Sequence, residues 1–360
     1  MRTAVLVSAL IGLAAAAPRP QDIEFDVVDT AATITEQGPA VTAVSQVISN
    51  DPVAAASTVY AAVLADPTDV TPTTTERSLE ERGVDVSAPC AVQPDGYGPK
   101  TTPDTVADFM ANPLYDQIAS AAPVPQGYNL VFASLNGSCN ANTYLGLTTL
   151  QSYDTIKCQQ LCDTAPLCTA FNIYMERDPS VNPNATMGCP NPPSIVNYKC
   201  TLWGAGVTVQ SASNTGQWRT QFQVAIRGSN GYVKNAPPPA QTNFTGPVEF
   251  GGAINAPSSY MGVKYFSGPY DVFQCAAACQ ANTAYDHRHP KSDGSYSACN
   301  FFNSYVLSIN NVPQGTYCSL YTQPWDKTYS TNYGQYRGSD YYSVSMSYGY
   351  TLAPQDQGHI

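Results

Sequence analysis

Histidine is scarce in this chain, which has only His287, His289 and His359 among its 360 residues. A Ser-His-Asp site needs a positioned histidine, and none precedes residue 287. The sequence also lacks a phosphate-binding loop, a dinucleotide fingerprint and a nucleophile elbow. We therefore expect a protein that is not an enzyme and that needs no cofactor.

Charged residues are also few, at 12% of the chain, and the formal net charge is −11. Residues 1–82 hold 11 acidic and 4 basic residues, so the remainder, with 16 acidic and 12 basic residues, is only mildly acidic. Binding to nucleic acid requires a basic stripe. We therefore exclude nucleic acid as a partner.

Long hydrophobic runs are missing as well. Met1 and Arg2 form a short positive start, residues 4–13 are mostly apolar, and residues 14–16 are alanines, which together predict a signal peptide over residues 1–16. The apolar run is too short to span a membrane, and no later run reaches about 18 residues. The tail, residues 352–360, is polar. We expect an exported protein, extracellular or associated with the cell wall, with no membrane span.

Three sequons agree with export and predict N-glycosylation at Asn136, Asn184 and Asn243. Eleven cysteines on a secretory route predict a disulfide framework. Because this count is odd, at least one cysteine is free or is bonded to another chain.

No cysteine occurs before Cys90. Residues 17–82 are rich in Ala, Val, Thr and Pro, and residues 40–64 favour a helix. The segment ends in Leu79-Glu-Glu-Arg82-Gly83, which resembles the ends of fungal propeptides cut by kexin-like proteases. Two interpretations stay open: a propeptide, with the mature chain beginning at Gly83, or a disordered arm. Residues 83–123 form an N-terminal extension with one helix expected over residues 104–120.

The rest of the chain repeats itself. Tyr-Asp-x-x-x-Cys-x-x-x-Cys occurs at residues 153–162 and 270–279, Cys-x-x-Phe-Asn-x-Tyr at 168–174 and 299–305, and Cys-x-Leu at 200–202 and 318–320. The Cys-x-x-x-Cys spacing places two cysteines on one face of a helix, and the later segments have strand composition. The sequence therefore predicts an α+β fold in which one helix packs on an antiparallel sheet, twice.

This cysteine pattern resembles the PAN/Apple family, and the wider chain is similar to a group of secreted ascomycete proteins with the Cys90–Pro99 motif. The resemblance implies two tandem disulfide-rich modules, at residues 124–233 and 244–351, joined by a Pro-rich linker at residues 234–243. It also implies nested pairing: Cys158–Cys200 and Cys162–Cys168 in the first module, and Cys275–Cys318 and Cys279–Cys299 in the second.

Three cysteines remain. Our first choice is a Cys90–Cys189 bond, which would tie the extension to the insertion before Cys200 and leave Cys139 free or bonded to another chain. A Cys90–Cys139 bond is the alternative. Cys139 is expected in a loop beside the Asn136 sequon.

PAN/Apple modules are binding modules, so the resemblance implies a binding or adhesion protein that recognises extracellular carbohydrate or protein. A secreted hydrolase and a structural cell-wall protein are the alternatives. Aromatic rings stack on sugars and arginine forks bind carboxylates. The candidate contacts are Trp203, Trp218 and Arg219 in the first module and Tyr321, Trp325, Tyr336 and Arg337 in the second. These residues also fit a purely structural role.

Two further groups of residues have candidate site chemistry. The loop around His287 and His289, with Asp286 and Asp293 nearby, has metal-ligand chemistry, although a polar loop is the expected outcome. Glu176 and Asp178 form a possible carboxylate pair for glycoside hydrolysis, for which a solvated turn paired with Arg177 is expected instead.

Overall fold

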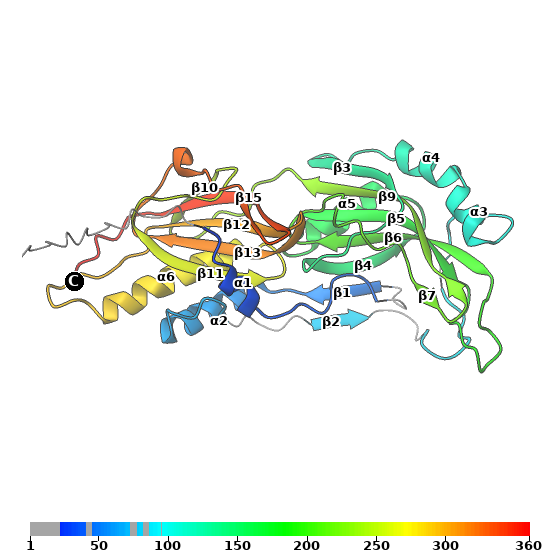
Figure 1. Ribbon diagram of the computed structural model, residues 1–360, viewed down its shortest axis with the longest axis horizontal. Helices are drawn as coiled ribbons and strands as arrows, with labels where there is room; N and C mark the ends of the chain where they lie inside the picture. The colour runs from blue at the N-terminus through cyan, green and yellow to red at the C-terminus, as the bar shows by residue number, and fades with distance from the viewer. Residues whose placement is uncertain (1–21, 41–44, 73–77, 82–85, 95) are drawn as a thin grey trace, which may run out of the picture.

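The computed structural model describes residues 22–40, 45–72, 78–81, 86–94 and 96–360. The fold is α+β, and its two main sheets are antiparallel. The two sheets lie side by side along the longest axis of the molecule (Figure 1). The predicted signal peptide, residues 1–16, and Gly83 lie outside the described residues.

The first sheet has seven strands in the order β2-β1-β4-β6-β5-β9-β3. Its strands are β1 (Ser45–Ser49), β2 (Ser78–Glu81), β3 (Tyr128–Leu135), β4 (Tyr144–Leu150), β5 (Ala170–Pro179), β6 (Ser194–Trp203) and β9 (Ala225–Lys234). A separate two-stranded hairpin consists of β7 (Trp218–Arg219) and β8 (Phe222–Gln223).

The second sheet follows the order β10-β15-β12-β13-β11, and β14 pairs with β15. These strands are β10 (Phe244–Glu249), β11 (Tyr260–Ser267), β12 (Phe301–Ile309), β13 (Val312–Tyr321), β14 (Gly334–Arg337) and β15 (Asp340–Leu352). A short 3-10 helix, η1 (Lys327–Tyr329), precedes β14.

The path β4-β6-β5-β9-β3 in the first sheet has the same order as β11-β13-β12-β15-β10 in the second. The registers also agree, because Phe171 lies opposite Leu202 and Phe302 lies opposite Leu320. In both sheets the first strand of this shared path, β4 or β11, has an irregularity at a glycine, Gly146 or Gly262. The sequence repeat is therefore a repeat of strand order and register.

One helix packs on each sheet and is bonded to it by two disulfides. Helix α5 (Thr155–Thr164) carries the Cys158–Cys200 and Cys162–Cys168 bonds, and α6 (Val272–Arg288) carries Cys275–Cys318 and Cys279–Cys299. These are the pairs that the family resemblance implies. An aspartate, Asp154 or Asp271, caps the first turn of each helix.

The N-terminal segment is folded against both sheets, so the disordered-arm interpretation is wrong for its described parts. It contains α1 (Phe25–Thr30), β1, α2 (Pro52–Ala65) and β2. The predicted helix over 40–64 is half right. Residues 45–49 form β1 instead, of which residues 45–47 pair with β4. The helix begins at Pro52, which is suited to a first helical position and follows the N-cap residue Asp51.

The extension holds two helices rather than the one expected: α3 (Val106–Ala111) and α4 (Leu114–Ala121). The break falls at Asn112-Pro113, because the residue before a proline is disfavoured in helical conformation. Cys90 bonds to Cys189 across 99 residues and so ties the extension to the insertion between β5 and β6, as our first choice proposed.

The two halves also touch directly. The backbone N–H of Tyr270 donates to the Gly204 carbonyl at 2.8 Å, and the Asn142 side chain donates to that of Gln314 at 2.8 Å. Gly204 lies so close to Pro269 that a Cβ atom there would meet the proline ring at 2.5 Å. The proline spacer therefore joins two halves that are already packed together.

Candidate ligand-binding site

Two of the predicted ligand contacts are core residues. Trp203 and Tyr321 are fully buried at equivalent ends of β6 and β13, opposite Tyr144 of β4 and Tyr260 of β11. The indole N–H of Trp203 donates to the Thr201 hydroxyl at 3.0 Å. The ligand hypothesis is wrong for this pair, because neither ring is open to a ligand.

Trp325 is packed rather than presented. Its ring lies edge-on to Tyr329, with the ring centres 4.5 Å apart, and its N–H donates to the Ser259 hydroxyl at 2.9 Å. Part of the ring contacts the cluster around Phe250 and Phe301. These contacts give Trp325 a structural role at the end of the second sheet.

Trp218 is exposed by 66% and lies on the β7–β8 hairpin of the first half. Its neighbour Arg219 is only partly exposed and donates to the Asn182 side-chain oxygen at 2.8 Å. This hairpin therefore offers one aromatic face to a ligand, while its guanidinium is already engaged by the protein.

The equivalent β14–β15 hairpin carries a larger aromatic surface, which we call the tyrosine hairpin (Tyr333, Tyr336 and Tyr341). Tyr333 and Tyr336 are exposed by 61% and 73%. The rings of Tyr336 and Tyr341 lie 4.8 Å apart at 46°. Only Tyr336 was singled out from the sequence; the high tyrosine density after Tyr321 was the signal for the other two.

Polar groups flank the tyrosine hairpin. The exposed Asn310 side chain donates to the Asp340 carboxylate at 2.8 Å and accepts from the Tyr341 N–H at 3.0 Å. Tyr341 donates its hydroxyl hydrogen to the Tyr333 carbonyl at 3.5 Å. The surface thus combines exposed ring faces with an amide and a carboxylate.

Arg337, beside Tyr336, is occupied by the N-terminal segment. Its guanidinium forms a two-pronged pair with Asp29, at 2.7 and 2.6 Å, and lies 5.1 Å from the centre of the Phe25 ring. The hydrogen bonds from Arg337 lower the pKa of Asp29. In this arrangement the predicted anion-binding fork already has an acidic partner.

The histidine candidates lie at the end of α6 rather than in a loop. The His289 ring packs on Tyr285 at 4.3 Å, and its Nδ1 atom is 2.9 Å from the Tyr285 carbonyl. His287 packs edge-on to Tyr296, with the ring centres 5.0 Å apart. Within the described ranges no group of three or more potential metal ligands occurs.

Glu176 and Asp178 are not in a solvated turn, and their partner is not Arg177. Both lie buried on β5, where they pair with the buried Lys199 of β6, at 3.2 Å for Asp178. The Asn197 side chain donates to Asp178 at 2.8 Å. Arg177 pairs instead with Asp104 of the extension at 2.9 Å.

Burial, reinforced by Asp178, raises the pKa of Glu176 to about 8. Burial alone would lower the pKa of Lys199, but the two carboxylates outweigh it and raise that pKa. Both shifts arise because the carboxylates of Glu176 and Asp178 share the single ammonium group of Lys199 in a buried site, where an unpaired charge is disfavoured. The cluster lies in the sheet interior, where its two acidic residues are only 6% exposed.

A cavity of about 360 Å³ lies between the two halves. It is lined by Leu167 and Thr169 from the first half, Phe273 and Met346 from the second, and the Pro237–Pro239 spacer. Its walls are mostly apolar, and Lys234 at its border is already paired with Asp163 at 2.8 Å.

Cys139 has no disulfide partner, but it cannot act as the surface tether that the sequence suggested, because it is buried with 1% exposure. Its N–H donates to the Asn172 side chain at 2.9 Å, as the N–H of Ile254 does to Asn303. Cys139 therefore occupies the position of an apolar core residue in the repeat. Burial raises the pKa of its thiol to about 12.

The three sequons lie at the surface or partly exposed. Asn136 and Asn243 are exposed, and Asn184 is partly exposed. The Asn184 side-chain oxygen accepts from the Thr186 hydroxyl at 2.7 Å. Glycosylation at these positions stays a prediction.

No family model, curated protein or solved structure matches this chain. None of the helices in the described ranges is long and apolar enough to cross a membrane.

Proposed function

We propose that this chain is an exported, non-enzymatic binding protein with two tandem PAN/Apple-like modules. The support is the shared strand order, the shared register and the equivalent helix-to-sheet disulfides of the two halves. Five disulfides are typical of an oxidising compartment. Binding, adhesion and export to the cell surface or matrix are all parts of this proposal.

The tyrosine hairpin is the proposed contact surface, and carbohydrate is the proposed ligand. The observation that carries this choice is the exposed ring of Tyr336, paired with the partly exposed ring of Tyr341, beside Asn310 and Asp340. Aromatic side chains present a flat apolar face with a polar tip, and the apolar faces of sugar rings stack on such surfaces. The amide and carboxylate supply hydrogen-bond partners for sugar hydroxyl groups.

The test is a glycan array probed with the purified protein and with the Tyr336→Ala/Tyr341→Ala double variant. We expect the double variant to lose at least about tenfold in affinity for the glycans retained, on the scale of the roughly 1–3 kcal/mol per ring that stacking on aromatic side chains contributes for nucleobases. Tyr97→Ala is the matched control, because Tyr97 is 52% exposed and lies in the N-terminal extension, far from the hairpin in sequence.

The same samples are assayed for release of reducing ends. Turnover without retention would replace the binding proposal with a hydrolase. Retention that survives the double variant would move the contact surface away from the tyrosine hairpin. Retention of a protein ligand and of no glycan would keep the binding function and change its ligand class.

A further inference from the structure

The two equivalent helices differ on their outer faces. Between its cysteines α5 reads Cys158-Gln-Gln-Leu-Cys162, whereas α6 reads Cys275-Ala-Ala-Ala-Cys279. Gln160 is exposed, but the equivalent Ala277 is buried with 7% exposure. An apolar stripe on the outer side of a helix needs another element to cover it. The α6 face is thus built to receive another element.

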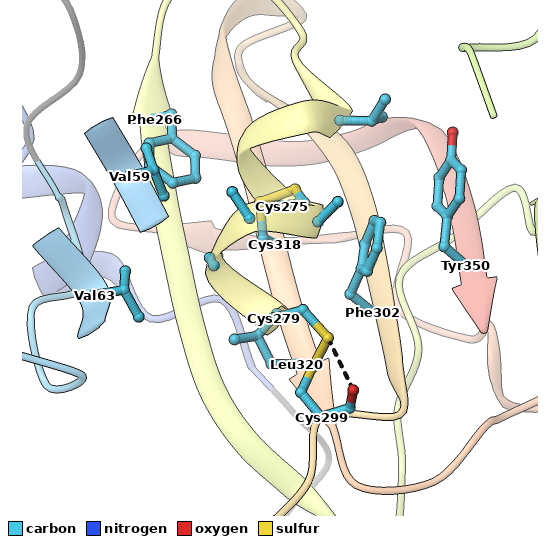
Figure 2. Packing of buried hydrophobic residues seen from close by; sticks show 14 of the residues in the cluster. Val59, Val63, Phe266, Cys275, Cys279, Cys299, Phe302, Cys318, Leu320 and Tyr350 are labelled. Atoms are coloured by element: carbon cyan, nitrogen blue, oxygen red, sulfur yellow. Dashed lines mark hydrogen bonds between the residues drawn. A yellow bond between two sulfur atoms is a disulfide. The ribbon is translucent and has the colours of Figure 1, made fainter. Parts of the chain in front are cut away.

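Helix α2 covers that face. Val59 and Val63 are fully buried in the same apolar cluster as Ala277, Ala278 and Phe266. Figure 2 shows both valines on the side of α2 that faces the disulfide-bearing helix. Small side chains on both helices permit close approach, so the two faces match in shape as well as in polarity.

The same N-terminal segment also binds the equivalent edge of each sheet. Strand β1 pairs with β4, and the buried side chain of Ile48 joins the cluster around Leu147. In the second sheet, the backbone N–H of Tyr265 on β11 donates to the Val70 carbonyl at 2.8 Å. The pairing of β1 with β4 is strand addition of the kind by which sheet edges bind extended peptides.

Charge adds to the fit. Residues 22–70 contain eight acidic residues and no basic one. Two cations of the second half receive this segment: Arg337 pairs with Asp29, and Lys264 donates to the Pro67 and Asp69 carbonyls at 2.7 Å each. The segment therefore has the chemistry of a ligand for the surface on which it lies.

No disulfide holds this segment. All five bonds join residues between Cys90 and Cys318, so residues 22–81, which we call the arm, are attached only through the main chain and through non-covalent contacts. An arm of this kind can be supplied by any copy of the chain, because every copy carries the same complementary surface.

We propose that the β4 edge and the α6 face form a docking surface for the arm of a second copy, so that two chains associate by exchanging arms. The exchanged unit is an extended strand followed by an alanine- and valine-rich helix. In the single chain the arm lies on its own surface at high effective concentration, so the exchange competes with this contact. Weakening the contact between the arm and its own chain should therefore favour exchange.

The test uses two full-length variants. Val59→Asp/Val63→Asp spoils the arm but leaves the surface intact. Ala277→Arg blocks the surface but leaves the arm intact. We expect each variant to be monomeric alone and an equimolar mixture to form a 1:1 complex of twice the mass, measured by light scattering after size exclusion. A chain that carries all three changes is the control. It has no intact arm to offer to the intact surface of the arm variant, so the two should not associate.

A mixture that stays monomeric, while both variants retain five mapped disulfides and melt cooperatively, would overturn the proposal and make the arm a permanent part of one chain. If the arm variant does not fold alone, it is co-expressed with the Ala277→Arg chain. Recovery of the arm variant in a complex with that chain supports arm exchange, and failure to recover it overturns the proposal.

Discussion

Asn172 and Asn303 make the same three hydrogen bonds in the two halves of the molecule. The side-chain oxygen of Asn172 accepts from Cys139 N–H at 2.9 Å, and its amide donates to the Ser229 hydroxyl at 2.8 Å and to the Asn230 carbonyl at 2.9 Å. Asn303 repeats these bonds with Ile254, Ser347 and Tyr348, at 2.9, 2.9 and 3.1 Å.

We predict that Asn303→Ala lowers the free energy of unfolding by about 2–4 kcal/mol, because it leaves the buried N–H of Ile254 without a partner and removes the hydrogen bonds to the Ser347 hydroxyl and the Tyr348 carbonyl. Asn172→Ala should cost a similar amount, since its environment is the same. Urea unfolding measures both. Asn129→Ala, at an exposed position of β3, is the matched control and should change stability by less than about 0.5 kcal/mol.

Cys139 should be inert in the folded protein. Its thiol is buried, and burial raises its pKa to about 12, so almost no reactive thiolate is present at pH 8. Iodoacetamide should leave the native protein unlabelled and add one label per chain after unfolding without reductant. An added surface cysteine, Asn235→Cys, gives the labelling rate of an exposed thiol. Rapid labelling of native Cys139 would contradict the buried position.

Stability should fall as pH rises toward 8. The folded-state pKa of Glu176 is raised from 4.5 to about 8, and burial raises that of Asp271 to about 6, so the folded protein binds more protons than the unfolded chain above pH 4.5. Each contribution is complete below the unfolded pKa and is lost as pH rises through the folded pKa. The loss from Glu176 is on the order of 2 kcal/mol or more.

Glu176→Gln should remove the slope between pH 6 and pH 8 and keep the part below pH 6 that belongs to Asp271. Glu249→Gln, at an exposed position, should leave the whole profile unchanged. Urea titrations at half-unit pH intervals give the profile. A slope above pH 6 that persists in Glu176→Gln would place its origin outside the Lys199 cluster.

The Cys90–Cys189 bond should be the first to open under mild reduction. Both of its cysteines are partly exposed, whereas those of the other four bonds are buried. Brief treatment with dithiothreitol followed by alkylation should therefore label Cys90 and Cys189 before any other pair, as read by peptide mass spectrometry. Earlier labelling of a cysteine on α5 or α6 would show that the helix-to-sheet bonds are the more accessible ones.

The repeat made the cysteine framework predictable from sequence. Its spacing placed two cysteines on one helical face, and the family resemblance supplied the pairing found for α5 and α6. Cys139 could have been interpreted in the same way, because an unpaired cysteine without a counterpart in the second half is also a small apolar residue. Its equivalence to Ile254 becomes clear only when both asparagine networks are seen.

The role of the arm could not be predicted in this way. Strand β1 pairs with β4 about 100 residues away, and such register depends on the facing edge rather than on local composition. The sequence also did not show which of the aromatic candidates are exposed. Trp203 and Trp218 both lie in the first half of the repeat. Trp203 is fully buried because it lies on a strand of the sheet, whereas Trp218 is 66% exposed because it lies on the β7–β8 hairpin.

The close contact of Gly204 with Pro269 has a consequence for any ligand long enough to reach both halves. A pair of sites on a loose tether adapts to many separations, but here the Tyr270–Gly204 hydrogen bond and the abutting glycine set one separation for the β7–β8 and β14–β15 hairpins. If both hairpins contact one ligand, the molecule would bind only those repeating ligands whose repeat spacing matches the distance between the hairpins.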